Sequence, residues 1–202
     1  MQKVFSLLCV LVLVASGCSN QENASISPDI DITYSKGNAN ADVVVTVYGD
    51  YESSFCAMFA LEILPHLQKD YIEKGKVRYV FKDYPMPNHE YSQKVSEATY
   101  CVGEQDESLY WQMHIDLFSN QEDFDIESLT ALVTEYGINV QAFDTCLDTG
   151  RYKNLVLRNR KEGQKLDVTA TPTIFVNEER LLGVQPYEKI KKVIEKEIPI
   201  EE

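Results

Sequence analysis

A serine and a cysteine three residues apart lie in the segment that joins a predicted strand to a predicted helix. The strand is the β-branched run at residues 43–47, and the joining segment is residues 50–59. Ser53 or Ser54 is placed to cap the helix, because a serine oxygen accepts a hydrogen bond from a free N–H of the first turn. Cys56 would lie in that first turn, where the helix dipole stabilises a thiolate. This spacing indicates thiol chemistry.

The same cysteine also belongs to an apolar face of the predicted helix. Apolar residues recur there at helical spacing, and they are Cys56, Phe59, Ala60, Ile63, Leu64 and Leu67. Burial raises the pKa of a thiol, whereas a helix N-terminus lowers it. We expect burial to dominate, so that Cys56 is inert or slowly reactive. An activated thiolate is the alternative.

The joining segment resembles the active site of DsbA-like thioredoxin-fold proteins, whose usual form is Asp-Tyr-x-Cys-Pro-Phe-Cys. Asp50 and Tyr51 match that form, and Cys56 matches its second, shielded cysteine. Ser53 stands where the family has its exposed nucleophilic cysteine, and Ser54 stands where it often has proline. A serine hydroxyl forms no disulfide, so two-electron cycling within this turn is excluded. The resemblance therefore implies a thiol–disulfide oxidoreductase scaffold with an impaired Ser-x-x-Cys site.

A second stretch of the resemblance, residues 168–174, immediately precedes a predicted strand. In thioredoxin folds a proline at this place is cis and faces the active-site turn, which implies the same for Pro172. The backbone of Thr171 would then offer hydrogen bonds to an extended peptide. A trans proline that only begins the strand is the alternative.

The amino-terminal residues have the features of an export signal. An apolar run at residues 4–14 follows a lysine and is too short to span a bilayer. Small residues before Cys18 resemble a bacterial lipobox. We predict a lipoprotein signal peptide at residues 1–17, lipid on Cys18 and a flexible polar tether at residues 18–33. The chain would be extracytoplasmic and anchored by lipid to a bacterial membrane, in the periplasm or on the outer face of the cell membrane. An ordinary secretory signal is the alternative.

The remaining cysteines raise the question of pairing, since the chain encodes five. Cys101 and Cys146 lie on separate predicted helices, and the stretches around them resemble matching stretches of DsbA-like proteins. The resemblance implies a disulfide between them, and two buried free thiols are the alternative. The bond would close a loop of about 45 residues and stabilise the fold by about 4 kcal/mol on the chain-entropy estimate. Cys56 would then have no partner.

The elements that must position these residues follow from hydrophobic periodicity and from capping residues. The predicted strands are 42–48, 77–82, 173–176 and 180–184, and the predicted helices are 54–74, 89–103, 107–119, 126–136, 139–148, 151–165 and 187–196. Pro65 should kink the first helix. Residues 34–38 are predicted to be a turn-rich entry segment.

This order of elements predicts an α/β chain in which residues 34–202 form one domain. A right-handed crossover unit, a hairpin and a closing helix resemble the thioredoxin-like fold. A helical subdomain, at about residues 88–166, is inserted after the second central strand. The resemblance to the DsbA-like family covers residues 34–196.

Composition limits the partners. The net charge of −13 argues against nucleic acid and against an anionic membrane surface. Membrane contact is expected only through the lipid anchor. The resemblance implies no cofactor, and the partners it implies are extended or unfolded protein clients, small thiols or a redox partner protein. No metal site is expected, because the histidines and Cys56 lack ligand spacing. No motif links a histidine to Ser53, which argues against a serine nucleophile.

Two functions remain open from the sequence. The first is a DsbA-like oxidoreductase that acts through the single thiol of Cys56, with an external thiol resolving the mixed disulfide. The second is a redox-inactive, chaperone-like protein that binds peptides or a partner beside Pro172.

Overall fold

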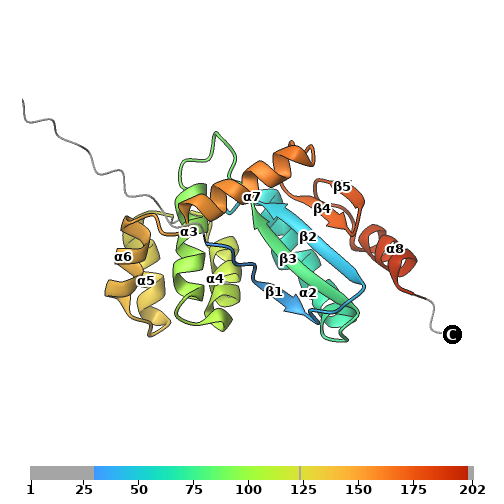
Figure 1. Ribbon diagram of the computed structural model, residues 1–202, viewed down its shortest axis with the longest axis horizontal. Helices are drawn as coiled ribbons and strands as arrows, with labels where there is room; N and C mark the ends of the chain where they lie inside the picture. The colour runs from blue at the N-terminus through green and yellow to red at the C-terminus, as the bar shows by residue number, and fades with distance from the viewer. Residues whose placement is uncertain (1–29, 123, 200–202) are drawn as a thin grey trace, which may run out of the picture.

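The computed structural model describes residues 30–122 and 124–199 and contains a five-stranded sheet with a block of helices beside it (Figure 1). The predicted signal peptide, Cys18 and most of the predicted tether lie outside the described residues. The strands are β1 (Ser35–Gly37), β2 (Val43–Gly49), β3 (Val77–Asp83), β4 (Thr173–Val176) and β5 (Glu179–Leu182). Their order in the sheet is β1-β3-β2-β4-β5.

Strand β2 is central, and its carboxyl end leads into the turn that contains Ser53. It pairs in parallel with β3 and antiparallel with β4. Its side chains Val43, Val45 and Val47 are fully buried, as expected for a β-branched run between two neighbours. The strand therefore delivers the turn to one fixed edge of the sheet.

A continuous helical segment follows the turn and alternates between α-helical and π-helical geometry. It comprises α1 (Ser54–Met58), η1 (Phe59–Ile63), α2 (Leu64–Leu67) and η2 (Gln68–Ile72). The π turn lies directly before Pro65, and the Leu64 N–H donates to the Phe59 carbonyl five residues back. A proline ring clashes with the carbonyl four residues earlier, and the wider turn relieves that conflict. The sequence predicts the helix and a disturbance at Pro65, but not the π geometry.

The remaining helices are α3 (Ser92–Gly103), α4 (Glu107–Ser119), α5 (Ile126–Glu135), α6 (Val140–Asp148), α7 (Lys153–Lys165) and α8 (Tyr187–Glu197). In Figure 1, α3 to α6 form the block beside the sheet, and α7 returns across one face of the sheet while α2 lies behind it. This arrangement confirms the thioredoxin-like fold with a helical insertion after β3. No helix in the described ranges is long and apolar enough to cross a bilayer.

Two predictions of local structure are wrong. Residues 35–37 form the edge strand β1, antiparallel to β3, with Ser35 opposite Val80. The segment lacks a strand pattern of its own, and pairing with β3 supplies its stability. Helix α3 begins at Ser92 rather than residue 89, because the residues before it are held in a loop by contacts described below.

A buried carboxylate joins the sheet to the helical block. Asp83, the last residue of β3, accepts hydrogen bonds from the Tyr100 hydroxyl of α3 at 2.7 Å and from the Asn159 amide of α7 at 3.3 Å. Burial raises the pKa of Asp83 to about 6, and the hydrogen bonds offset only part of that rise. The insertion is thus tied to the sheet by a polar contact inside the core.

Candidate functional site

The turn between β2 and α1 places Ser53 at the N-cap of α1. Ser53 has extended backbone geometry, and its Oγ accepts a hydrogen bond from the Cys56 N–H at 3.3 Å. This is the capping role predicted for Ser53 or Ser54. Gly49 precedes the turn, and a Cβ there would lie 2.4 Å from the Phe81 ring. The turn can therefore pack this closely on β3 only with glycine at that position.

Cys56 lies beneath the turn with 2% of its surface exposed, and it is a free thiol. Its Sγ accepts a hydrogen bond from the Asp50 N–H at 3.4 Å. Burial raises the pKa of the Cys56 thiol to about 11, although hydrogen bonds from Asp50, Ser53 and Thr171 act in the opposite direction. At neutral pH the sulfur is therefore almost entirely protonated and shielded from solvent.

The loop before β4 lies against the same turn. The Thr171–Pro172 peptide bond is cis, in agreement with the expectation from the resemblance. The Ser53 hydroxyl donates a long hydrogen bond of 3.4 Å to the Thr171 carbonyl. The structure thus brings Ser53, Cys56, Thr171 and Pro172 together from segments more than a hundred residues apart.

Asp50, the first residue of the turn, is a fully buried carboxylate that accepts four hydrogen bonds. Its Oδ1 accepts from the Glu52 N–H at 2.8 Å and from the Ser92 hydroxyl at 2.6 Å. Its Oδ2 accepts from the Met86 N–H at 2.7 Å and pairs with His89 Nδ1 at 2.8 Å. One side chain thereby fixes the turn, the loop after β3 and the start of α3.

Two further side chains, one from the turn itself and one from a distant segment, hold the turn in place. Glu52 Oε2 accepts hydrogen bonds from the N–H groups of Tyr91 and Ser92, at 2.8 and 2.5 Å, and so caps α3 from a different segment. Gln121 donates to the Tyr51 and Ser53 carbonyls, at 2.7 and 3.0 Å. Sequence patterns predict no role for Glu52, His89, Ser92 or Gln121, and for Asp50 they give only the match to the DsbA-like form. The available signal for this network was the pair of acidic residues, Asp50 and Glu52, that follows the buried strand β2.

Below the turn, Tyr51 and His114 form the centre of a buried aromatic cluster. The Tyr51 hydroxyl lies 2.9 Å from His114 Nδ1, and Phe81 and Phe118 pack against both rings. Burial lowers the pKa of His114 to about 3, so the imidazole is neutral at physiological pH. The cluster supports the turn through packing. Within the described residues, no histidine hydrogen-bonds to Ser53, and no group of three metal-ligating side chains is present.

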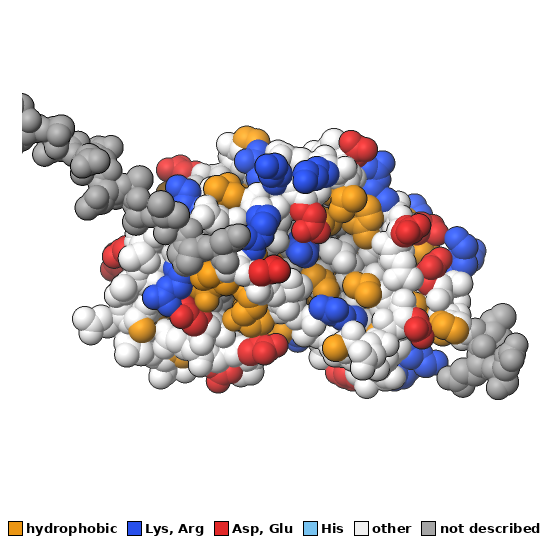
Figure 2. All heavy atoms as spheres, in the orientation of Figure 1, with side chains coloured by type: hydrophobic (Ala, Val, Ile, Leu, Met, Phe, Trp, Pro, Cys, Tyr) orange, Lys and Arg blue, Asp and Glu red, His pale blue; other side chains and the backbone are white. Residues whose placement is uncertain are grey.

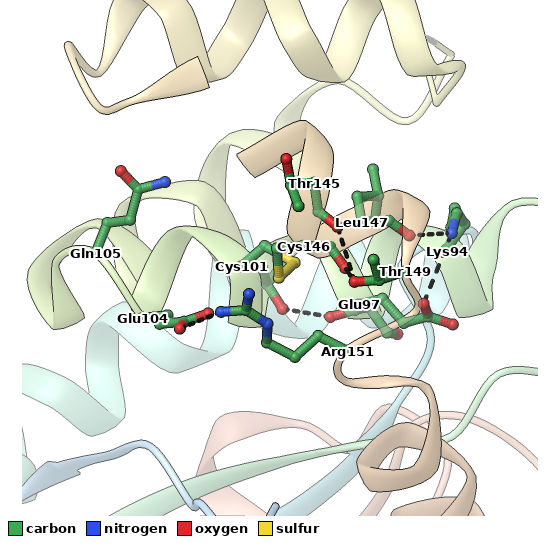
Figure 3. Close-up of a disulfide and its surroundings, with 12 residues drawn as sticks. Lys94, Glu97, Cys101, Glu104, Gln105, Thr145, Cys146, Leu147, Thr149 and Arg151 are labelled. Carbon is green, nitrogen blue, oxygen red and sulfur yellow. Dashed lines mark hydrogen bonds and ion pairs between the residues drawn. A yellow bond between two sulfur atoms is a disulfide. The ribbon is translucent and has the colours of Figure 1, made fainter. Parts of the chain in front are cut away.

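A disulfide joins Cys101 of α3 to Cys146 of α6, with the two Cα atoms 5.9 Å apart. Figure 3 shows the bond between the two helices, with Arg151 next to it and Lys94 farther along the helices beside Leu147. Lys94 Nζ donates to the Leu147 carbonyl at 2.6 Å and so links the same two helices a second time. The disulfide lies in the helical block rather than in the turn, which leaves Cys56 unpaired.

Comparisons with known proteins agree with the fold. A family model described as Thioredoxin matches residues 31–196. Disulfide bond formation protein D of Bacillus subtilis is 32% identical over 168 residues, covering 80% of this chain and 75% of the relative. A probable disulfide bond formation protein D of Bacillus cereus is 28% identical over 171 residues, covering 81% of this chain and 78% of the relative.

Solved structures give the same picture. Oxidised BdbD from Bacillus subtilis has a TM-score of 0.76 and 30% identity, covering 82% of this chain and 92% of that chain. The thiol–disulfide exchange protein α-DsbA2 from Wolbachia pipientis has a TM-score of 0.72 and 22% identity, over 81% and 86% of the two chains. The second likeness concerns the fold alone.

The burial of Cys56 predicts slow alkylation with a high pH midpoint. In a chain that carries Cys18→Ser, the rate at which iodoacetamide alkylates Cys56 should rise with pH. The midpoint of that rise should lie near pH 11, because only the thiolate reacts. At pH 8 the folded protein should react at least about a hundredfold more slowly than the same protein in urea. Mass spectrometry of quenched samples measures both rates. A midpoint below pH 8 in the folded state would show that the helix N-terminus outweighs burial.

Proposed function

Because the chain belongs to the thioredoxin family and is a homologue of DsbA-like disulfide bond formation proteins, we propose that it is an extracytoplasmic lipoprotein that binds extended polypeptides without exchanging disulfides. The observation that carries this proposal is the pair at the turn. Ser53 caps α1 at the position where the resemblance to DsbA-like proteins places the attacking thiol, and Cys56 is buried with its thiol pKa raised. Thiol–disulfide exchange needs an accessible thiolate, and this turn offers none.

Exposed apolar side chains beside the turn support a binding role. Phe55 and Met58 of α1 are 60% and 42% exposed, and Tyr91, at the loop held by Glu52, is 42% exposed. Apolar surface of this kind is typical of a site that contacts other polypeptides. The backbone of Thr171 beside Pro172 would add hydrogen bonds to an extended chain. Clients would therefore be unfolded or extended segments rather than folded partners.

A second candidate function is a single-thiol oxidoreductase. The hydrogen bond from the Asp50 N–H to Cys56 Sγ favours it, since a thiolate formed there would be partly stabilised. The thiolate would attack a client disulfide, form a mixed disulfide and release one client thiolate. An external thiolate would then attack the client sulfur of the mixed disulfide, which frees the Cys56 thiolate and leaves the client bonded to the external thiol. Such a cycle requires Cys56 to become exposed.

Replacing Ser53 by cysteine should create the missing redox pair. Residues 53 and 56 are already in contact through the helix cap, and a thiol at the N-cap position would have its pKa lowered by the helix N-terminus. In Ser53→Cys we expect a disulfide between residues 53 and 56, titratable in glutathione buffers and read by alkylation. Oxidative refolding of a reduced client should accelerate in this variant, while the wild type stays at the uncatalysed rate.

Ser53→Ala is the matched control. It removes the cap and should cost about 1 kcal/mol of stability, but it should leave redox activity at background. Turnover of disulfides by the wild type at the rate of Ser53→Cys would contradict the proposed function and favour the single-thiol cycle.

Charge placed on the exposed apolar surface should weaken client binding. Phe55→Glu is expected to reduce suppression of reduced-insulin aggregation, with an apparent affinity about tenfold lower, because burial of a phenylalanine side chain stabilises by about 1.5–3 kcal/mol. Light scattering against protein concentration measures the effect. Leu157→Glu makes the same kind of change on α7, away from the turn, and should leave suppression intact. Equal loss in both variants would mean that the surface around the turn is not the binding site.

The lipid anchor has its own test. Cys18→Ser removes the sulfur that would carry the thioether-linked lipid, so the protein should move from the membrane fraction to the soluble fraction of fractionated cells. Immunoblotting of both fractions measures this. Membrane association that survives the substitution would show that another feature holds the chain there.

A further inference from the structure

Charge is distributed very unevenly along this acidic chain. Residues 95–150 contain twelve acidic residues and neither lysine nor arginine, whereas residues 151–165 contain six basic residues and one acidic residue. Figure 2 shows Lys and Arg side chains gathered over α7. The net charge of the whole chain, which argued against contact with anionic surfaces, therefore does not describe this helix.

The basic residues of α7 include three lysines on one exposed stripe. Lys153, Leu157, Lys161 and Lys165 follow one another at steps of four, so they share a helix face. We call these four residues the α7 face. All four are exposed, and Leu157 has 37% of its surface in solvent. The ion pairs among the described residues include none made by the three lysines.

Glu162, the one acidic residue of α7, interacts with residues of the sheet rather than with the lysines of the α7 face. Its carboxylate pairs with Lys82 at 3.3 Å and accepts a hydrogen bond from the Tyr48 hydroxyl at 2.7 Å. The α7 face consequently presents positive charge and an exposed leucine together. Basic residues beside exposed apolar side chains are typical of helices that lie on membrane surfaces.

The amino-terminal end of the described chain lies against the same helix. The Ile30 carbonyl accepts a hydrogen bond from the Arg158 guanidinium, and Asp31 lies 3.7 Å from Arg158. Ile30 lies twelve positions after Cys18, and twelve residues of chain span at most about 40 Å. Lipid attached at Cys18 would therefore hold the bilayer within reach of α7.

We propose that the α7 face binds the anionic lipid headgroups of the membrane that anchors the chain. That this membrane lies near α7 in the cell rests on the proposed lipid anchor, whereas the binding of anionic headgroups by the α7 face does not. Each lysine close to an anionic surface strengthens binding about fivefold, and Leu157 adds apolar contact at the headgroup boundary. The helical segment that begins with α1 lies on the other face of the sheet, as Figure 1 shows for α2. Docking through α7 would leave Phe55 and Met58 open to clients.

Vesicle sedimentation tests this proposal without the anchor. Within the described residues, the hydrophobic core and the side chains packed against it begin at Ile30, so a chain of residues 18–202 with Cys18→Ser retains every core residue that the structure describes. It should sediment with vesicles that contain phosphatidylglycerol and stay in solution with pure phosphatidylcholine vesicles. High salt should release it, because screening shortens the reach of the charges.

Charge reversal on α7 provides the decisive comparison. The triple variant Lys153→Glu, Lys161→Glu, Lys165→Glu should bind phosphatidylglycerol vesicles at least about a hundredfold more weakly, because three lysines that each contribute about fivefold are lost together. The matched control changes the same net charge on α8, through Lys189→Glu, Lys192→Glu and Lys196→Glu, which are also exposed. It should retain most of the binding.

Three results would overturn the proposal. The first is that the parent chain fails to sediment with anionic vesicles. The second is an equal loss of vesicle binding in the α7 and α8 variants, and the third is a change of oligomeric state in the α7 variant. The last would assign the α7 face to the acidic helical block of a second copy. Failure of the lipid anchor is read separately, from the fractionation of Cys18→Ser.

Discussion

The four hydrogen bonds of the buried Asp50 carboxylate are the interaction on which the site depends. An ionised carboxylate is costly to bury unless donors surround it, and here the donors come from the turn itself, from the loop after β3 and from Ser92 at the start of α3. The cost of an incomplete set therefore forces three segments into one arrangement. This arrangement also positions Ser53 and Cys56. The Asp50 N–H donates to Cys56 Sγ, and the Asp50 carbonyl accepts from the Ser53 N–H.

Two opposing effects act on the pKa of the Cys56 thiol. A helix N-terminus stabilises a thiolate by a modest amount that fades with depth, whereas removal from water acts on the charged form in full. Cys56 is three residues inside the cap and points into the core, so burial prevails. Ser53, at the N-cap itself, lies closer to the helix end than Cys56, and its buried side chain is 7% exposed. Its hydroxyl caps the helix, and it has no charge for the dipole to stabilise.

Local signals in the sequence were sufficient for most of the fold and for the centre of the site. The β-branched run of β2, the cap at Ser53 and the apolar spacing that buries Cys56 all act within a few residues, so the sequence displays them directly. The sequence does not predict edge strand β1, because its extended conformation is stabilised by pairing with β3 rather than by its own residues. The contacts of Gln121 with the turn were missed because they join residues about seventy positions apart, and no local pattern encodes such a contact.

The absence of lysine and arginine between residues 95 and 150 also bears on how the protein is cut. Trypsin-like proteases cleave after basic residues, so they find no site from the residue after Lys94 to Arg151. Cys101 and Cys146 therefore remain in one fragment after complete tryptic digestion, and their bond closes a ring within it rather than joining two fragments. Trypsin-like proteolysis would leave residues 95–151, which hold α4 to α6 and all of α3 except its first three residues, in one covalent piece even after the sheet had been degraded.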